Sequence, residues 1–137
     1  MNLFSTSHPE ISEELIHSIH RKVSNPMNIL LSRDFRVSKV ETALKQMYTA
    51  FAPGLDGMPP IFYQKSWPTV SPIVPKSVLD FLNLGITPPN FNKTHIVLIP
   101  KVKEPKRVTD FRPISLCNVA YKIASKTMAN RLKQVLP

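Results

Sequence analysis

Residues 94–117 read THIVLIPKVKEPKRVTDFRPISLC, and this stretch decides the fold of the chain. Apolar and β-branched residues run without interruption over Thr94–Ile99, a pattern that favours a buried strand over a helix. A second strand is predicted over Phe111–Leu116, where Pro113 indicates an edge position or a bulge. We therefore predict that the two segments pair as an antiparallel hairpin.

Cations gather in the loop between the two predicted strands: Lys101, Lys103, Lys106 and Arg107. Arg112 adds a fifth cation in the second strand. Because like charges repel and gain nothing by burial, this cluster does not stabilise the hairpin, and phosphates are its natural partner. Two other interpretations stay open: Lys101 could be a solvated loop lysine, and Arg112 could form a salt bridge with Asp110 or with a carboxylate elsewhere.

The composition fits one folded domain, or part of a larger one, with a basic surface. The chain has 137 residues, of which 42% are hydrophobic, and a formal net charge of +9. Such a charge favours nucleic acid or an anionic surface as a partner, although a solvated basic face would look the same. A single cysteine excludes an internal disulfide. The sequence has neither a long apolar run nor a secretory signal, so we expect no membrane contact and an intracellular location, in the nucleus or the cytoplasm.

Helices are predicted around the hairpin, giving an α+β fold that is mostly helical with one small antiparallel hairpin. The predicted helices cover Ile11–Lys22, Val37–Tyr48, Ile61–Trp67 and Ser71–Leu84, and a basic helix follows Asn118, a possible N-cap. Its buried face is predicted to contain Val119, Ile123, Met128, Leu132 and Val135.

Breaks in the helical pattern are predicted at Asn25-Pro26, at Trp67-Pro68 and at Gly85, a natural C-cap. His17 and His20 stand three residues apart on the first predicted helix and could share a metal. No acidic or thiol ligand is placed to complete such a site, so we interpret them as surface histidines.

The segment APGLDG, residues 52–57, is predicted to form a tight turn built on Pro53, Gly54, Asp56 and Gly57. Glycine adopts positive φ at no steric cost, and aspartate bonds the backbone two residues on. The segment lacks the spacings of the phosphate-binding glycine loops. We therefore interpret Asp56 as a turn-former rather than a catalyst.

Five stretches taken together are more specific than any one of them. They are ALKQM at Ala43–Met47, APGLDG at Ala52–Gly57, FYQKSW at Phe62–Trp67, LNLGITPPNFNKTHIVLIPK at Leu82–Lys101 and DFRPISLCNVAYKIASKTMANRLKQVLP at Asp110–Pro137. In this order they resemble the N-terminal part of the reverse transcriptase of non-LTR (LINE-type) retrotransposons, most of all the plant ones. The resemblance covers nearly the whole chain, faintly over the first thirty residues and densely after Thr42.

The resemblance implies the fingers subdomain of a right-handed polymerase, running to the edge of the palm. Residues 1–35 would be a helical, linker-like segment and residues 36–137 a partial reverse transcriptase domain. Lys101 and Arg112 match basic fingers positions that contact the nucleotide triphosphate or the template, and the other loop cations would contact nucleic-acid backbone. The implied partners are an RNA template, a DNA primer and deoxynucleotide triphosphates. The chain departs from the family at Phe51, where lysine is common, and at Leu55, where proline is common.

The resemblance assigns no catalytic residue to this chain. Polymerisation needs two metal ions held by palm aspartates, and the nine acidic residues here include no Asp-Asp pair. We expect no metal site in the chain, Mg²⁺ only together with a palm, and no activity from the chain alone. The sequence is thus interpreted as an incomplete retrotransposon-derived polypeptide. The alternatives are a small basic nucleic-acid-binding module and a relic without function, and uncovered apolar faces would favour self-association.

Overall fold

The computed structural model describes residue 18 and residues 23–136, and the chain divides after Ser32 into two compact units. In the first unit, helix α2 covers Asn25–Ser32. The break predicted at Asn25-Pro26 lies instead at residues 23 and 24, because Asn25 and Pro26 begin the helix. A proline in the first turn lacks only an N–H that would have no helical partner there. The helix predicted over Ile11–Lys22, with its two histidines, lies outside the described residues.

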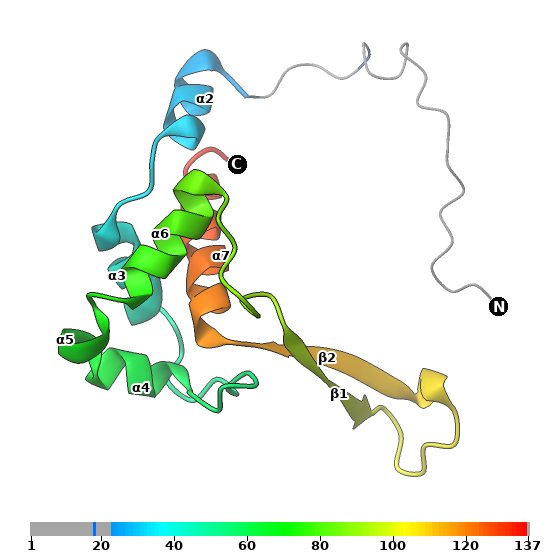
Figure 1. The fold of residues 1–137 in the computed structure, drawn as a ribbon. Helices are drawn as coiled ribbons and strands as arrows, with labels where there is room; N and C mark the ends of the chain where they lie inside the picture. Colours follow the sequence, from blue (N-terminus) through cyan, green and yellow to red (C-terminus); the bar gives the residue numbers. More distant parts are fainter. Residues whose placement is uncertain (1–17, 19–22, 137) are drawn as a thin grey trace. The chain divides into compact units, whose positions relative to one another are not determined.

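The second unit, residues 33–137, combines a helical cluster with one β-hairpin (Figure 1). Its elements are α3 (Val37–Lys45), α4 (Pro60–Lys65), α5 (Trp67–Val70), α6 (Val74–Leu84), β1 (Thr94–Pro100), the 3-10 turn η1 (Val108–Asp110), β2 (Phe111–Cys117) and α7 (Val119–Leu132). Helices α3, α6 and α7 pack against one another, and the hairpin extends away from them. The predicted α+β fold, mostly helical with a small antiparallel hairpin, is confirmed.

The core forms where the apolar stripes of the three packed helices meet. Helix α3 contributes Val40 and Leu44, spaced one turn apart, while α6 contributes Val78 and α7 contributes Ile123. Each of these side chains is at most 1% exposed. Burying an aliphatic side chain of this size stabilises the fold by about 1.5–3 kcal/mol. Phe91, from the segment between α6 and β1, closes one side of the core against the rings of its neighbours.

The ends of the middle helices differ from the predicted ones by a few residues. Helix α6 begins at Val74 rather than Ser71, and Ile73, just before it, is exposed. It ends as predicted at Gly85, whose φ of +70° allows the backbone bonds that close the last turn. Trp67-Pro68 does not end a helix but begins the short helix α5, again with proline in a first turn.

The predicted buried face of α7 is confirmed at Val119 and Ile123, which are both 0% exposed, and is wrong further along the helix. Met128 and Leu132 are 45% and 44% exposed, whereas Thr127 is buried. The Thr127 hydroxyl donates to the Ile123 carbonyl over 2.8 Å, which satisfies its polar group inside the core. A hydrophobicity pattern cannot recognise a threonine that satisfies its own hydroxyl in this way, so the predicted face was displaced around the helix.

The hairpin pairs residue for residue, from Thr94 opposite Cys117 to Pro100 opposite Phe111, without a bulge. Pro113 is tolerated because each strand of a two-stranded sheet has an unpaired edge. The prediction of a buried first strand is wrong: Ile96 is 61% exposed and Leu98 is 52% exposed. The strands form because they pair with each other, while the helical cluster covers neither face of the ribbon.

Candidate nucleic-acid interface

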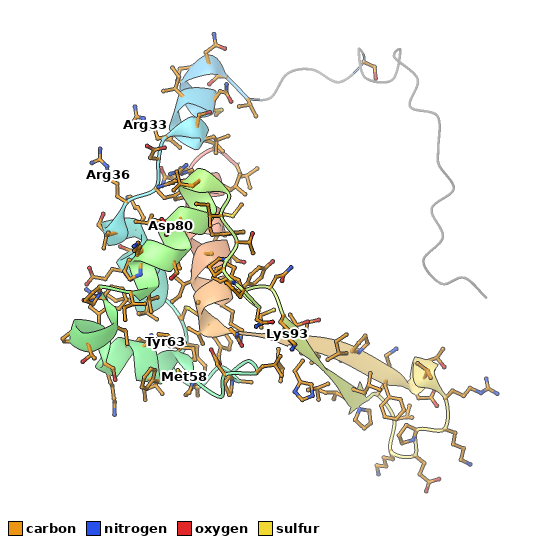
Figure 2. The ribbon with its side chains drawn as sticks, in the orientation of Figure 1. Arg33, Arg36, Met58, Tyr63, Asp80 and Lys93 are labelled. Carbon is orange, nitrogen blue, oxygen red and sulfur yellow. The ribbon has the colours of Figure 1, made fainter. Side chains whose placement is uncertain are left out.

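The hairpin register places Lys101 and Arg112 on the same face of the ribbon. Arg112 lies opposite Ile99, and the Lys101 amide continues the ladder by donating to the Asp110 carbonyl over 2.7 Å. Side chains alternate between faces along a strand, so Ile99 and Arg112 project to one side. Lys101 lies one residue past the end of β1, and the same alternation, extended through its bond to Asp110, puts it on that side. The five cations of the hairpin are exposed, and Figure 2 shows the side chains of its loop pointing outward from the helical cluster. The hairpin thus presents a solvated, positively charged end.

Asp110 organises the backbone of the cationic loop. Its Oδ2 accepts hydrogen bonds from the amides of Arg107, at 2.9 Å, and Lys106, at 3.0 Å. These bonds are the main reason why the pKa of Asp110 lies below its ordinary value, with smaller contributions from Thr109 and from the charge of Lys101. A single carboxylate therefore fixes the turn from which several cations project.

The two interpretations left open for Lys101 and Arg112 receive different answers. The Lys101 ammonium donates to the Thr109 carbonyl over 2.9 Å, so it is tied to the loop but keeps two further N–H donors. Arg112 forms no salt bridge with Asp110, whose carboxylate bonds the loop amides instead. The interpretation of Arg112 as a salt-bridge partner of Asp110 is therefore wrong, and Arg112 is exposed to solvent.

The predicted turn at residues 52–57 exists, but its two glycines serve different purposes. Gly57 has a φ of +67°, the left-handed conformation that glycine favours. At Gly54, a Cβ would overlap the backbone N and Cα of Asn118, so this glycine permits a close approach. Asn118 occupies the N-cap position of α7 without capping it, because its Oδ1 accepts from the Asp56 amide at 3.4 Å. The turn therefore packs against the junction between hairpin and helix.

Asp56 is a turn-former, as predicted. Its Oδ1 accepts a hydrogen bond from the Met58 amide, two residues on, over 3.1 Å. Its Oδ2 accepts from the Tyr63 hydroxyl over 3.4 Å, and Figure 2 shows Tyr63 beside Met58. Burial, together with the nearby Asp56 charge and this bond, raises the pKa of Tyr63 to about 12. The carboxylate holds the turn to α4.

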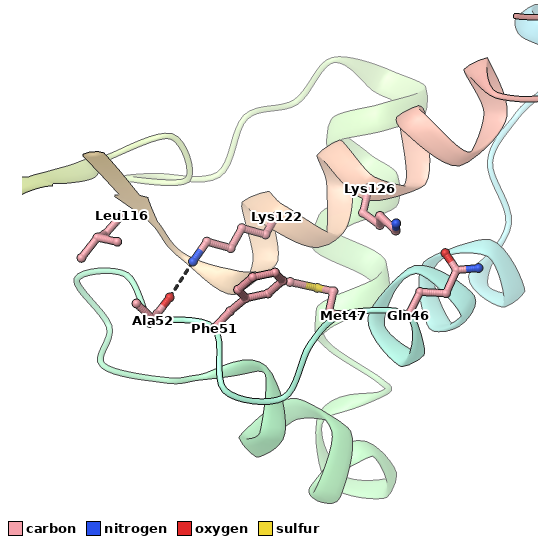
Figure 3. Close-up of a pocket in the computed structure, with 7 residues that line it drawn as sticks. All are labelled: Gln46, Met47, Phe51, Ala52, Leu116, Lys122 and Lys126. Carbon is pink, nitrogen blue, oxygen red and sulfur yellow. Dashed lines mark hydrogen bonds between the residues drawn. The ribbon is translucent and has the colours of Figure 1, made fainter. Parts of the chain in front are cut away.

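A pocket of about 360 Å³ opens where the turn, the end of α3 and helix α7 meet (Figure 3). The residues lining it are Gln46, Met47, Phe51, Ala52, Leu116, Lys122 and Lys126. Lys122 donates to the Ala52 carbonyl over 2.6 Å (Figure 3). Sequence reasoning missed this site. The one local signal is the spacing of the two lysines, which places both on one side of a helix.

The acidic residues that the structure describes do not gather into a metal site. Nowhere in the described part of the chain do three His, Cys, Asp or Glu side chains come together as ligands. Asp56 and Asp110 each use their carboxylates to hold a local turn. Among the described residues, no helix has both the length and the apolar character needed to cross a bilayer.

Comparison with known proteins connects the chain to a transposon. No protein-family model matches it. In an alignment 137 residues long that covers 98% of the chain, it is 31% identical to "Transposon TX1 uncharacterized 149 kDa protein" of Xenopus laevis. The aligned part is 10% of that protein, so the chain spans about a tenth of the length of this relative. The similarity supports a transposon-related origin.

Proposed function

We propose that the chain is a fingers fragment of the reverse transcriptase of a non-LTR retrotransposon, of the type found in plants. In this role the hairpin contacts a nucleotide triphosphate and an RNA template paired with a DNA primer. The observation that carries the proposal is the placement of Lys101 and Arg112 on one face of an exposed ribbon. The family resemblance of the surrounding motifs and the similarity to a transposon protein support it.

Each of the two residues would recognise phosphate in a different way. The planar guanidinium of Arg112 suits a bidentate contact with two phosphate oxygens, while the Lys101 ammonium acts as a point charge. The Thr109 carbonyl restrains that ammonium before any ligand arrives, which lowers the entropy lost on binding. Lys103, Lys106 and Arg107 would contact the nucleic-acid backbone, adding affinity without sequence preference.

Chemistry is not proposed for this chain by itself. Phosphoryl transfer in polymerases uses two metal ions to hold the attacking and leaving oxygens. Asp56 and Asp110, which are held in separate turns, do not fit that task. A reaction would need Mg²⁺ bound by carboxylates that a palm subdomain supplies.

A small nucleic-acid-binding module remains the second candidate, because the cationic loop is ordered by bonds within the hairpin itself. Such a module would bind RNA or DNA through the same cations without selecting a triphosphate. The two functions therefore differ in one measurable property, which is binding of free nucleotide through Lys101 and Arg112.

The test measures binding of a deoxynucleotide triphosphate by calorimetry, and of a labelled RNA–DNA primer–template by fluorescence anisotropy. Lys101→Gln and Arg112→Gln are each expected to weaken both affinities about 10- to 150-fold, since a hydrogen bond to a charged group contributes about 1.5–3 kcal/mol. Lys76→Gln, at an exposed position on α6, is the matched control. The affinities of Arg112→Lys should lie between those of the unaltered chain and those of Arg112→Gln, because lysine keeps the charge but lacks the planar guanidinium fork.

The outcomes separate the candidates. The binding module would be favoured if the unaltered chain bound no free nucleotide while Lys101→Gln and Arg112→Gln weakened primer–template binding. Affinities equal to those of Lys76→Gln in both assays would refute a role for this face of the hairpin.

A further inference from the structure

Three residues on successive turns of helix α7 lie on the side that faces the end of α3 and the loop after it. The first and the third form hydrogen bonds there, and the middle one does not, among the residues that the structure describes. Lys122 donates to the Ala52 carbonyl over 2.6 Å, and Asn130 donates to Gln46 Oε1 over 2.8 Å. Lys126 lies between them on the same side of the helix, because residues four apart share a face. In the described part of the chain no hydrogen bond or ion pair engages its ammonium, and Lys126 is one of the residues that line the pocket.

The pocket combines an apolar floor with a positive rim. Met47, Phe51 and Leu116 provide the floor, and none of the described lining residues is acidic. The Phe51 ring is 52% exposed, and Tyr48, at 65%, meets it edge to face at 5.7 Å. Exposed aromatic rings beside lysines form the platform on which bases of single-stranded nucleic acid stack.

The pocket also continues the cationic face of the hairpin. Leu116, Ile114 and Arg112 alternate along β2 and so project to the same side. Arg112 and Leu116 are four residues apart, which is about 13–14 Å along a strand. A single strand held by its phosphates at the hairpin end can therefore reach the pocket at the hairpin base.

We propose that this pocket binds one unpaired base of single-stranded RNA or DNA, with the base against Phe51 and the adjoining phosphate at Lys126. The inference rests on the proposed function for the idea that nucleic acid lies along the hairpin. It adds a second contact that depends on the base being unpaired. A duplex keeps its bases stacked inside and contacts only the cations of the hairpin.

The experiment uses fluorescence anisotropy to measure how tightly the complete chain binds three labelled nucleic acids: an oligouridine, its DNA counterpart and a duplex. Phe51→Ala is expected to weaken single-strand binding about 5- to 150-fold, the equivalent of a stacking contribution of about 1–3 kcal/mol. Lys126→Gln should also weaken it and reduce the slope of log affinity against log salt by about 0.7. Duplex affinity should stay unchanged in both variants.

Two matched controls separate the pocket from general effects. Phe62→Ala removes a partly exposed ring on α4, and Lys76→Gln removes an exposed lysine on α6. Phe51→Leu keeps an apolar side chain but loses the aromatic face, so it should bind single strands as weakly as Phe51→Ala even where the alanine variant is less stable. Lys126→Arg should retain binding.

The results distinguish failure of this inference from failure of the proposed function. If the Phe51 and Lys126 variants match their controls while Arg112→Gln weakens binding, the pocket has another occupant, such as a peptide, and the inference is overturned. If the pocket variants weaken single-strand binding while Arg112→Gln does not, the pocket stands and the hairpin role falls. No binding of single strands by the unaltered chain would overturn both.

Discussion

Gly54 offers the sharpest test of how the turn at residues 52–57 is held. In Gly54→Ala, the new methyl group would overlap the Asn118 backbone, which cannot rotate away as a side chain can. Overpacking of this kind costs about 1–3 kcal/mol. Relief requires the turn to move, which weakens the bonds from Lys122 to Ala52 and from Asp56 to Asn118. Because each bond contributes about 0.5–1.5 kcal/mol, overpacking and the loss of both bonds together cost about 2–6 kcal/mol.

Gly57→Ala is the matched comparison within the same turn. A Cβ there meets no atom within 4 Å, but the φ of +67° is unfavourable for alanine by about 1–2 kcal/mol. Both variants reduce the freedom of the unfolded chain equally, so that contribution cancels in the comparison. Gly54→Ala should therefore destabilise the fold more than Gly57→Ala, by about 1 kcal/mol when the low ends of the two ranges are compared.

The assay is urea denaturation of the complete chain, followed by circular dichroism and by the fluorescence of its single tryptophan, Trp67, which packs against the core. Asn118→Ala should not rescue Gly54→Ala, because the obstructing backbone atoms remain. Equal destabilisation by the two glycine variants, or a larger effect at Gly57, would refute a close approach at Gly54.

Two further predictions concern α4 and the ribbon. Because the pKa of Tyr63 is raised from 10.0 to about 12, its hydroxyl keeps its proton in the folded state over a pH range where it loses it in the unfolded state. The contribution of the neutral Tyr63 hydroxyl to stability is therefore fully present below pH 10 and is lost as pH rises through about 12. Tyr63→Phe should abolish the last phase of a tyrosinate absorbance titration, and a titration identical to that of the unaltered chain would contradict the assignment. Ile96→Lys should reduce self-association in sedimentation velocity without lowering the melting temperature, because the ribbon face that it occupies is uncovered. A large fall in melting temperature would show that Ile96 is packed.

The hairpin could be predicted because its signals are local. Continuous β-branched residues, a charged loop and a second apolar run suffice to indicate two paired strands. Burial is a different matter, since Thr94–Ile99 has the composition of a core strand yet is exposed on both faces. Composition reports that a surface is apolar, and only the packing of the rest of the chain decides whether anything covers it.

The turn and the pocket were predicted less completely because they depend on distant parts of the chain. The reasoning on Gly54 considered only its backbone freedom, whereas the contact that requires glycine comes from Asn118, far along the sequence. Lys122 and Lys126 were expected to be polar residues on a basic helix, and nothing local distinguishes the one that bonds Ala52 from the one that faces a pocket. Such roles follow from how α7 meets the loop after α3.

The register of the hairpin connects the loop to the proposed function. If β2 moved by one residue, Ile99 would face Phe111, and Arg112 would turn to the opposite side of the ribbon from Lys101. The Lys101–Asp110 backbone bond and the bonds from the Asp110 carboxylate to the loop amides oppose that shift. Asp110 therefore holds the backbone of the cationic loop in position. An acidic residue at the base of a basic loop is what allows the loop to present its charges on a defined face.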